Sequence, residues 1–315
     1  MNIQLEHIHK RFGRVHANND ISAHFASGRI VGVLGEKGAG KSARMKILAG
    51  YQPADSGEIL IDGQQAAYHG PQAAIAAGVG MLQQDPLDVA AFTVLENFLF
   101  GQPKTLTRRA ARGRLSALSA QFGFDLDPDL PAARLSIGQR QQLEIARLLA
   151  LGVRALILDE PTTGISAQQK ERLFAALRRL AREEGMIVLL VSHKLEDVIA
   201  LCDEVVVLRA GRLVGTATMP VTPADLVRLM FEQELVPPSR VDSALGTTVF
   251  EVQAVSVHDR RVSVEAFSLA LRAGEVIGLA GLDGSGQELI MRACVGLIRT
   301  DRGQIRLGQR LMTHR

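Results

Sequence analysis

The stretch Gly35–Glu–Lys–Gly–Ala–Gly–Lys–Ser42 decides the fold. It follows the continuous apolar run Ile30–Leu34 and overlaps the start of a segment of helical composition, Ser42–Leu48. Its glycines let backbone N–H groups converge on an anion, which also feels the N-terminus of the following helix. Lys41 would hold the β- and γ-phosphates of a nucleotide, and Ser42 would ligate Mg²⁺. The pattern therefore predicts a strand, a phosphate-binding loop and a helix, in this order.

Two carboxylates end a second apolar run, in Ala155–Leu–Ile–Leu–Asp159–Glu160. Carboxylates are costly to bury without a partner or a function. With a phosphate loop upstream, the pair indicates Asp159 in the Mg²⁺ shell and Glu160 as the general base for an attacking water. The alternative is a strand end with two solvated acids, and the phosphate loop favours the functional interpretation.

Apolar runs that alternate with helical patterns predict the rest of the architecture. Short β-rich runs at Ala155–Leu158, Met186–Val191 and Val205–Leu208 are separated by helical patterns, one of them between residues 173 and 180. Buried strands that alternate with helices are typical of an α/β fold with a mainly parallel sheet. Residues 104–150 are rich in Ala, Leu, Arg and Gln at helical spacing, which predicts a helical subdomain.

The chain contains a repeat. Gly28–Gly35 has a partner in Gly274–Gly281, at an offset of 246 residues (281 − 35). The same offset relates further glycines of the first copy to glycines of the second: Gly38 to Gly284, Gly40 to Gly286, Gly50 to Gly296 and Gly57 to Gly303. One unit therefore occurs twice, and the second copy is shorter than the first.

A proline pair and small polar residues between the two copies indicate a linker. We expect a first domain at residues 1–236 with a helical subdomain at about 86–150, a linker at 237–247, and a partial, degenerate second domain at 248–315.

Composition excludes several classes of protein. The 315 residues are 47% hydrophobic and 22% charged, which is enough for a substantial core and excludes a disordered tail. The net charge is +3, but acids nearly match bases and aromatic residues make up only 4%, so no nucleic-acid partner is expected. The longest apolar stretches are shorter than the roughly 18 residues of a membrane span. Two distant cysteines indicate a reducing interior.

Two further motifs make the pattern specific. Leu135–Ser–Ile–Gly–Gln139 lies shortly before Asp159, and Ser192–His193 ends a later strand. Together with the phosphate loop and the acid pair, they resemble the ATP-binding subunits of ABC transporters over nearly the whole chain. The resemblance implies an α/β P-loop NTPase (ABC ATPase) domain with a mainly parallel sheet, an antiparallel β subdomain and a helical signature subdomain, plus a partial second copy. It also implies ATP and Mg²⁺ as cofactors.

The resemblance assigns roles to single residues. The signature at Leu135–Gln139 would bind the γ-phosphate of ATP held by an opposite domain, and His193 would bridge that phosphate and Glu160. Gln84 would be the Q-loop glutamine, with Gln83 a weaker choice, and Phe12 would stack on adenine. The resemblance implies the catalytic residues Glu160, His193 and Gln84 and the metal ligands Ser42, Gln84 and Asp159. It implies nucleotide contacts at Phe12, Gly35, Glu36, Lys37, Gly38, Ala39, Gly40, Lys41, Ser42, Ala43, Leu135, Ser136, Ile137, Gly138 and Gln139. Taken alone, a His after a strand is more often structural, and a Phe is often a core residue.

The second copy points to a branch of the family. In tandem importers of monosaccharides and nucleosides, two such domains share one chain and the second phosphate loop is degenerate. Gly281–Leu–Asp–Gly–Ser–Gly–Gln287–Glu288 looks like that second loop, because Gln287 replaces the lysine and Glu288 would repel phosphate. We expect no ATP turnover there. The segments Gly78–Gln84 and Leu135–Gln139 favour the nucleoside type within this branch.

Three departures from the family pattern matter. Lys37 and Ala43 replace the usual Asn and Thr without removing a direct ligand, and Thr163–Gly–Ile–Ser166 lacks the usual D-loop aspartate. Up to Arg315 there is no second signature or acid pair, so the composite site cannot close within this chain. Either two copies pair, a separate polypeptide completes the site, or the sequence is a piece of a longer tandem protein, which is the interpretation we favour.

The resemblance implies an energy-coupling ATPase of an importer for a small solute of the monosaccharide or nucleoside type. Its partners would be membrane permease subunits, a second ATPase domain and, indirectly, a solute-binding protein, and it would lie peripherally at the cytoplasmic face of the cell membrane. The permease contact falls on the segment from Gln84 to Phe100. The alternatives are a soluble ABC ATPase acting on ribosomes or DNA, for which no long charged helical arm is visible, and a remnant that binds ATP without hydrolysing it.

Overall fold

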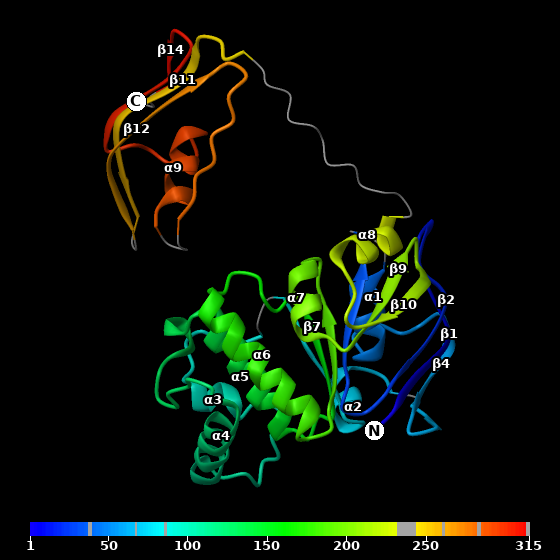
Figure 1. The fold of residues 1–315 in the computed structure, drawn as a ribbon. Helices are drawn as coiled ribbons and strands as arrows, with labels where there is room; N and C mark the ends of the chain where they lie inside the picture. Colours follow the sequence, from blue (N-terminus) through cyan, green and yellow to red (C-terminus); the bar gives the residue numbers. More distant parts are fainter. Residues whose placement is uncertain are drawn as a thin grey trace. The chain divides into compact units, whose positions relative to one another are not determined.

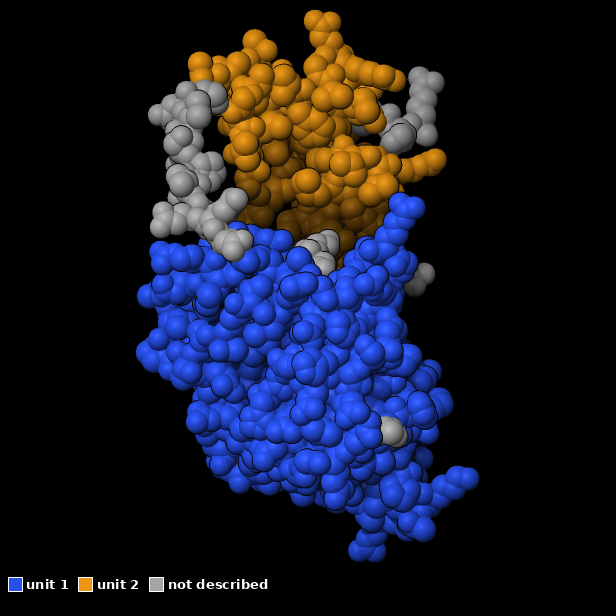
Figure 2. Space-filling view, turned by 90° about the vertical axis from the view of Figure 1, so that its right-hand side faces the viewer, with its two compact units in different colours: residues 1–235 blue, residues 236–315 orange. Residues whose placement is uncertain are grey.

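The chain is described here by a computed structural model that covers residues 1–36, 40–66, 68–84, 87–231, 244–259, 262–281 and 285–312. Its internal contacts divide the chain into two compact units, residues 1–235 and residues 236–315 (Figure 2).

The core of unit 1 is a six-stranded sheet. Its strand order is β10 (Arg212–Thr218), β9 (Glu204–Arg209), β3 (Ile30–Gly35), β8 (Ile187–Val191), β7 (Ala155–Asp159) and β6 (Val79–Leu82). All neighbours from β9 to β6 pair in parallel, and only the edge strand β10 is antiparallel to β9. The mainly parallel sheet that the apolar runs predict is therefore confirmed.

A second sheet of unit 1 is antiparallel throughout. Its order is β2 (Val15–Phe25), β1 (Ile3–Phe12), β4 (Ser56–Ile61) and β5 (Gln64–Gln65). This sheet confirms the expected antiparallel β subdomain. The helices of unit 1 are α1 (Lys41–Leu48), α2 (Pro71–Ala76), α3 (Val94–Phe98), α4 (Arg108–Phe122), α5 (Ile137–Ala150), α6 (Ala167–Arg182), α7 (Leu195–Leu201) and α8 (Pro223–Phe231), with a 3₁₀ turn at Ala132–Arg134.

The two faces of the parallel sheet pack against different partners. Successive residues of a strand point to opposite faces, and β3 follows this rule. Ile30 and Leu34 join the core formed with α3 to α8, whereas Val31 and Val33 join the core formed with α1, β1 and β2. Helix α1 thus lies on the same side of the parallel sheet as the antiparallel sheet, and α3, α4 and α5 gather on the other side (Figure 1).

Unit 2 repeats the antiparallel part of unit 1. It contains β11 (Thr248–His258), β12 (Ser263–Arg272), α9 (Gln287–Cys294), β13 (Arg302–Leu307) and β14 (Arg310–Leu311). Helix α9 follows α1 by the same offset of 246 residues (287 − 41), as β13 follows β4. The strand order β12–β11–β13–β14 reproduces β2–β1–β4–β5. The repeat in the sequence is therefore also a repeat of structure over these elements.

The counterpart of β3 in unit 2 is not a strand. Residues 275–281 have no strand partner among the described residues, and Val276 is 96% exposed. In unit 1 the two strands that flank β3, β8 and β9, come from the chain after residue 186. An apolar segment becomes a buried strand only where neighbours satisfy its backbone groups.

Hydrogen exchange should separate these two related segments. We expect backbone amides of residues 276–280 to exchange nearly as fast as in an unfolded peptide, and amides of residues 31–34 to be among the slowest in the chain. Mass spectrometry after deuterium labelling of the full chain measures both. Strong protection at 276–280 would show that this segment pairs with a strand and would contradict the expectation.

Arg44 is an unusual core residue. It lies on α1 one turn after Gly40, is fully buried, and its Nε, Nη1 and Nη2 atoms have no hydrogen-bond partner among the described residues. Burial lowers the pKa of its guanidinium to about 10, so the group stays charged near neutral pH. A buried charge without a partner destabilises the folded state.

We expect Arg44→Met to stabilise unit 1 by about 1–4 kcal/mol at pH 7, because it removes the charge and keeps an apolar chain of similar length. Guanidinium chloride titration measures the change in the free energy of unfolding. The gain is present in full below pH about 10 and shrinks at higher pH, since the folded state then loses the buried charge before the unfolded state does. Lys46→Met is the matched control, because Lys46 lies on the same helix but is only half-buried, and it should bring no gain. Equal or lower stability of Arg44→Met at pH 7 would contradict the expectation.

Candidate functional site

The parallel strands place the predicted site residues at one edge of the sheet. β3 runs into the phosphate loop, β7 ends at Asp159, and β8 is followed by Ser192 and His193. Gln84 follows β6, where it is exposed. Because neighbouring parallel strands end at the same edge, residues far apart in the sequence come together there.

Lys41 faces back onto its own loop. Its Nζ donates hydrogen bonds to the carbonyl oxygens of Gly35 at 2.6 Å and Glu36 at 2.9 Å. Burial lowers the pKa of Lys41, while the negative charges of Glu160 and Asp159 act in the opposite direction. The ammonium group is therefore held at the loop and close enough to both carboxylates to sense their charge. Lys37, Gly38 and Ala39 lie outside the described residues, as does the side chain of Ser42.

Glu160 and His193 form a pair. His193 Nδ1 lies 2.8 Å from Glu160 Oε2, and the Glu160 side chain is 15% exposed whereas that of His193 is 65% exposed. The Glu160 backbone has φ of +51°, in the left-handed region that few residues other than glycine adopt. Its N–H donates to the Val191 carbonyl at 2.9 Å, which ties Glu160 to the end of β8. The strained backbone aims the carboxylate at the histidine.

The acid that precedes Glu160 fits a hard metal ion. Asp159 is 8% exposed at the end of β7, and its charge acts on Lys41. Carboxylate and hydroxyl oxygens are the protein ligands that Mg²⁺ prefers. The donor set Asp159, Ser42 and Gln84 therefore has the right chemistry for Mg²⁺ bound together with a nucleotide.

The signature begins a helix. Ser136 is the N-cap of α5: its Oγ accepts from Gln139 N at 3.2 Å, and Gln139 Oε1 accepts from Ser136 N at 3.0 Å. Gln139 Nε2 also donates to the Asp125 carbonyl at 3.0 Å, so this side chain is engaged within its own domain. Leu135 and Gly138 are buried, and Ile137 is exposed. The surface of the signature is thus the Ser136 hydroxyl, the Ile137 side chain and the start of α5.

Phe12 ends β1 at the surface, where its ring is 48% exposed and Lys10 Nζ lies 5.7 Å from the ring centre. The alternative of a core phenylalanine therefore does not apply. An exposed aromatic face is available for stacking.

Comparison with known proteins fits this geometry. Residues 18–163 match the family model described as ABC transporter. The chain is 36% identical over 322 residues to the ribose import ATP-binding protein RbsA 2 of Streptomyces avermitilis. The aligned region covers 99% of this chain and 62% of that protein. It is 33% identical to the nucleoside import ATP-binding protein NupA of Lactococcus lactis subsp. cremoris, over 99% of this chain and 63% of that protein. The chain is a member of the ABC ATPase family.

This ABC ATPase chain spans about three fifths of the length of the relatives it matches. Among solved structures it is similar to CbiO1 of Clostridium perfringens, part of an ABC transporter complex, with 26% identity and a TM-score of 0.61 over 69% of this chain and 88% of that one. None of the helices in the described residues combines the length and apolar character of a membrane span.

The site of this ABC ATPase contains a buried carboxylate that sequence analysis missed. Asp197 on α7 is 1% exposed, and its Oδ2 accepts from Thr162 Oγ1 at 2.5 Å while its Oδ1 pairs with Lys170 Nζ at 3.1 Å. Lys194 Nζ donates to the Thr162 carbonyl at 3.2 Å. This network joins the segment after Glu160 to the segment after His193. Its sequence signal is weak, since an acid in the first turn of a helix is common.

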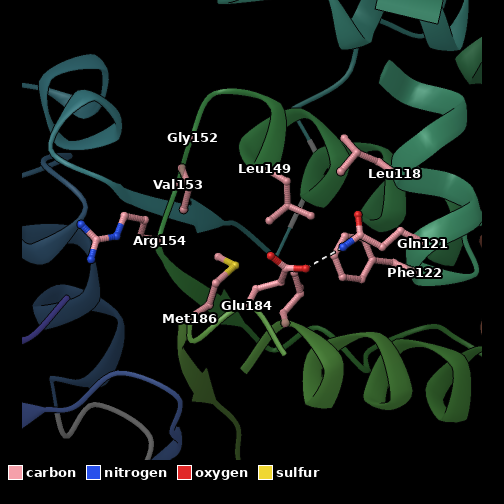
Figure 3. A pocket seen from close by; sticks show the side chains of 10 residues that line it. Leu118, Gln121, Phe122, Leu149, Gly152, Val153, Arg154, Glu184 and Met186 are labelled. Carbon is pink, nitrogen blue, oxygen red and sulfur yellow. Dashed lines mark hydrogen bonds between the residues drawn. The ribbon is translucent and has the colours of Figure 1, made fainter. Parts of the chain in front are cut away.

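A cavity of about 300 Å³ lies away from these residues (Figure 3). It opens beside Arg154 and Met186, which precede β7 and β8, so it lies at the edge of the sheet opposite the phosphate loop. Gln121 Nε2 donates to Glu184 Oε1 at 2.6 Å across it. The cavity is lined by Leu118, Gln121, Phe122, Leu149, Gly152, Val153, Arg154, Leu180, Glu184 and Met186. It is no part of the nucleotide site.

Two glycines hold β2 against the phosphate loop. Gly40 has φ of +89°, and a Cβ there would overlap the Ala17 carbonyl oxygen of β2. Gly211 lies in the turn between β9 and β10, and a Cβ there would overlap the His16 carbonyl oxygen. The backbone of β2 at residues 16 and 17 therefore lies in close contact with both glycines.

We expect Gly40→Ala to lower ATP affinity more than about tenfold, or about 1.4 kcal/mol, because the new methyl group displaces the end of the phosphate loop. Gly63→Ala is the matched control: Gly63 has φ of +78° but no heavy atom within 4 Å of its Cβ position. Both variants carry the strain of a left-handed alanine. Isothermal titration calorimetry with ATP compares them, and equal affinity losses in both variants would show that the contact with β2 does not shape the loop.

Proposed function

We propose that this chain binds and hydrolyses ATP and, through a membrane permease, energises the import of a small solute of the monosaccharide or nucleoside type. The observation that carries the proposal is the Glu160–His193 pair, with 2.8 Å between Oε2 and Nδ1, at the same edge of the sheet as Lys41. The names of the relatives, for ribose and nucleoside import, support the class of solute.

The chemistry follows from where these groups lie. Lys41 leaves its carbonyl partners to bind the β- and γ-phosphates. Glu160 takes a proton from a water as that water's oxygen bonds to the γ-phosphorus and the bond from the γ-phosphorus to the bridging β-phosphate oxygen breaks. His193 holds the Glu160 carboxylate and contacts the γ-phosphate. Asp159, Ser42 and Gln84 would hold Mg²⁺, which would neutralise part of the phosphate charge. Phe12 stacks on adenine.

The signature serves a second nucleotide site in this proposal. The Ser136 hydroxyl and the first N–H groups of α5 suit the γ-phosphate of ATP held by another ATPase domain. That domain belongs to a second copy, a separate polypeptide or the same longer chain. The second phosphate loop of this chain does not turn over ATP. There, Gln287 Nε2 donates to the Gly281 carbonyl at 3.3 Å, as Lys41 does at Gly35, but an amide brings no positive charge.

An exposed apolar surface supports a permease partner. It consists of Leu87, Val89, Phe92 and Phe100, whose side chains are exposed, and the rings of Phe92 and Phe100 stack with centres 5.7 Å apart. The buried Asn97 holds this segment, since its Oδ1 accepts from Val89 N at 2.8 Å and its Nδ2 donates to the Val89 carbonyl at 3.1 Å. Asp85 and Pro86 lie outside the described residues. Such a patch on a rigid frame suits a protein partner, and we infer a peripheral place at the cytoplasmic face of the cell membrane, with a solute-binding protein reached through the permease.

Steady-state ATPase activity against protein concentration tests the proposal. We expect the specific activity of residues 1–315 to rise with concentration, because two copies complete the site. Glu160→Gln should bind ATP normally and lose about 100-fold or more of the turnover, as expected for a general base. Lys41→Ala should lose both binding and turnover.

Two results would contradict the proposal. Normal turnover in Glu160→Gln would remove Glu160 from the role of base. Stoichiometric ATP binding without phosphate release at any concentration would contradict completion of the site by two copies, and would favour either a separate partner domain or the remnant that binds ATP without hydrolysing it.

A further inference from the structure

The N-terminus of α6 packs against the signature. Gln169 Nε2 donates to Ser136 Oγ at 3.0 Å. A Cβ on Gly138 would lie 3.1 Å from the Gln169 amide, and a Cβ on Gly164 would lie 2.9 Å from Ile137 Cδ1. α6 begins seven residues after Glu160 (167 − 160), so the segment that carries the proposed base also contacts the signature.

The cap of α6 fixes which end of the Gln169 amide faces Ser136. Gln169 Oε1 accepts from the backbone N of Ser166 at 2.9 Å, and Gln169 N donates to Ser166 Oγ at 3.3 Å. A backbone N–H can only donate, so the amide atom that it meets is the oxygen. The opposite end of the amide is therefore the NH₂ group, and Ser136 Oγ must accept from it.

In these two contacts Ser136 Oγ only accepts, so its hydroxyl hydrogen is available to donate to another group. Its Oγ accepts one hydrogen bond from Gln139 N at 3.2 Å and a second from Gln169 Nε2 at 3.0 Å. A hydroxyl has two acceptor lone pairs and one donor hydrogen. With both lone pairs used, the hydrogen points away from these two partners, on a residue that is exposed.

We propose that Gln169 is a positioning residue, which keeps the Ser136 hydroxyl as a hydrogen-bond donor to the γ-phosphate of ATP held by a second ATPase domain. The inference rests on the proposed function. Gln169 touches no nucleotide. It acts by occupying the acceptor side of Ser136, and its own orientation is set by the cap that begins α6. The start of α6 thereby links the segment after Glu160 to the phosphate-facing atom of the signature.

Gln169→Glu removes the hydrogen-bond donor that occupies Ser136 Oγ. The carboxylate keeps the shape of the side chain and still accepts from Ser166 N, so the cap of α6 remains. It cannot donate, and Ser136 turns its hydrogen toward the carboxylate, which also brings a negative charge near the phosphate position. Ser166→Ala is the matched control, since it removes one half of the cap and leaves the Gln169 amide in place.

The experiment uses residues 1–315 with Glu160→Gln, so that bound ATP persists, and measures Mg²⁺–ATP-dependent self-association by sedimentation velocity, with ATP affinity by calorimetry. We expect Gln169→Glu to weaken self-association at least about tenfold and to leave ATP affinity within about twofold. Ser166→Ala should change neither. In the protein that keeps Glu160, Gln169→Glu should lower kcat and leave the KM for ATP unchanged.

Each other outcome overturns a distinct part of this account. Unchanged self-association in Gln169→Glu would refute the role of Gln169 and leave the proposed function intact. An equal loss in Ser166→Ala would show that helix capping, rather than the donor, is what matters. A parent protein that binds ATP but never self-associates would overturn pairing through the signature, and with it the role of Gln169.

Discussion

The parallel pairing of β3, β8 and β7 is the constraint on which the site depends. Backbone hydrogen bonds fix the register of Val33 opposite Val191 and of Val191 opposite Asp159. The local sequence of the phosphate loop does not indicate where the acid pair lies, and the local sequence of the acid pair does not indicate where the loop lies. The sheet brings them together. The left-handed backbone of Glu160 and its hydrogen bond to the Val191 carbonyl then fix the position of Glu160 relative to the end of β8. A loop, a carboxylate pair and a histidine thus become one site through main-chain pairing.

Local sequence patterns predicted the parts of the molecule whose chemistry is local. The strand before Lys41, the helix that starts at Lys41, the mainly parallel sheet and the repeat all follow from short patterns of glycine and apolar residues. Phe12 is at the surface rather than in the core, which its sequence context left open. The roles of the individual site residues remain predictions.

Other features were beyond sequence analysis because they arise from contacts between distant segments. Gln169 and Ser136 are 33 residues apart, and Thr162 and Asp197 are 35 apart, with no motif to relate them. Arg44 reads as an ordinary helical residue, and arginine is rarely fully buried. Residues 276–280 resemble β3 in sequence but lack its neighbours. A β-strand is a property of the pairing as much as of the residues, so near-identical patterns have different structures in the two units.

The close contact of β2 with Gly40 and Gly211 has an evolutionary consequence. The nearest atoms to both glycines are carbonyl oxygens of residues 16 and 17, so these contacts depend chiefly on the backbone of β2. Substitutions at exposed positions of these strands, including the aromatic position at Phe12, can therefore occur without a change in the contacts at Gly40 and Gly211. In the proposed function, recognition of adenine by Phe12 can then change separately from recognition of the phosphates, while the close backbone contacts require glycine at positions 40 and 211.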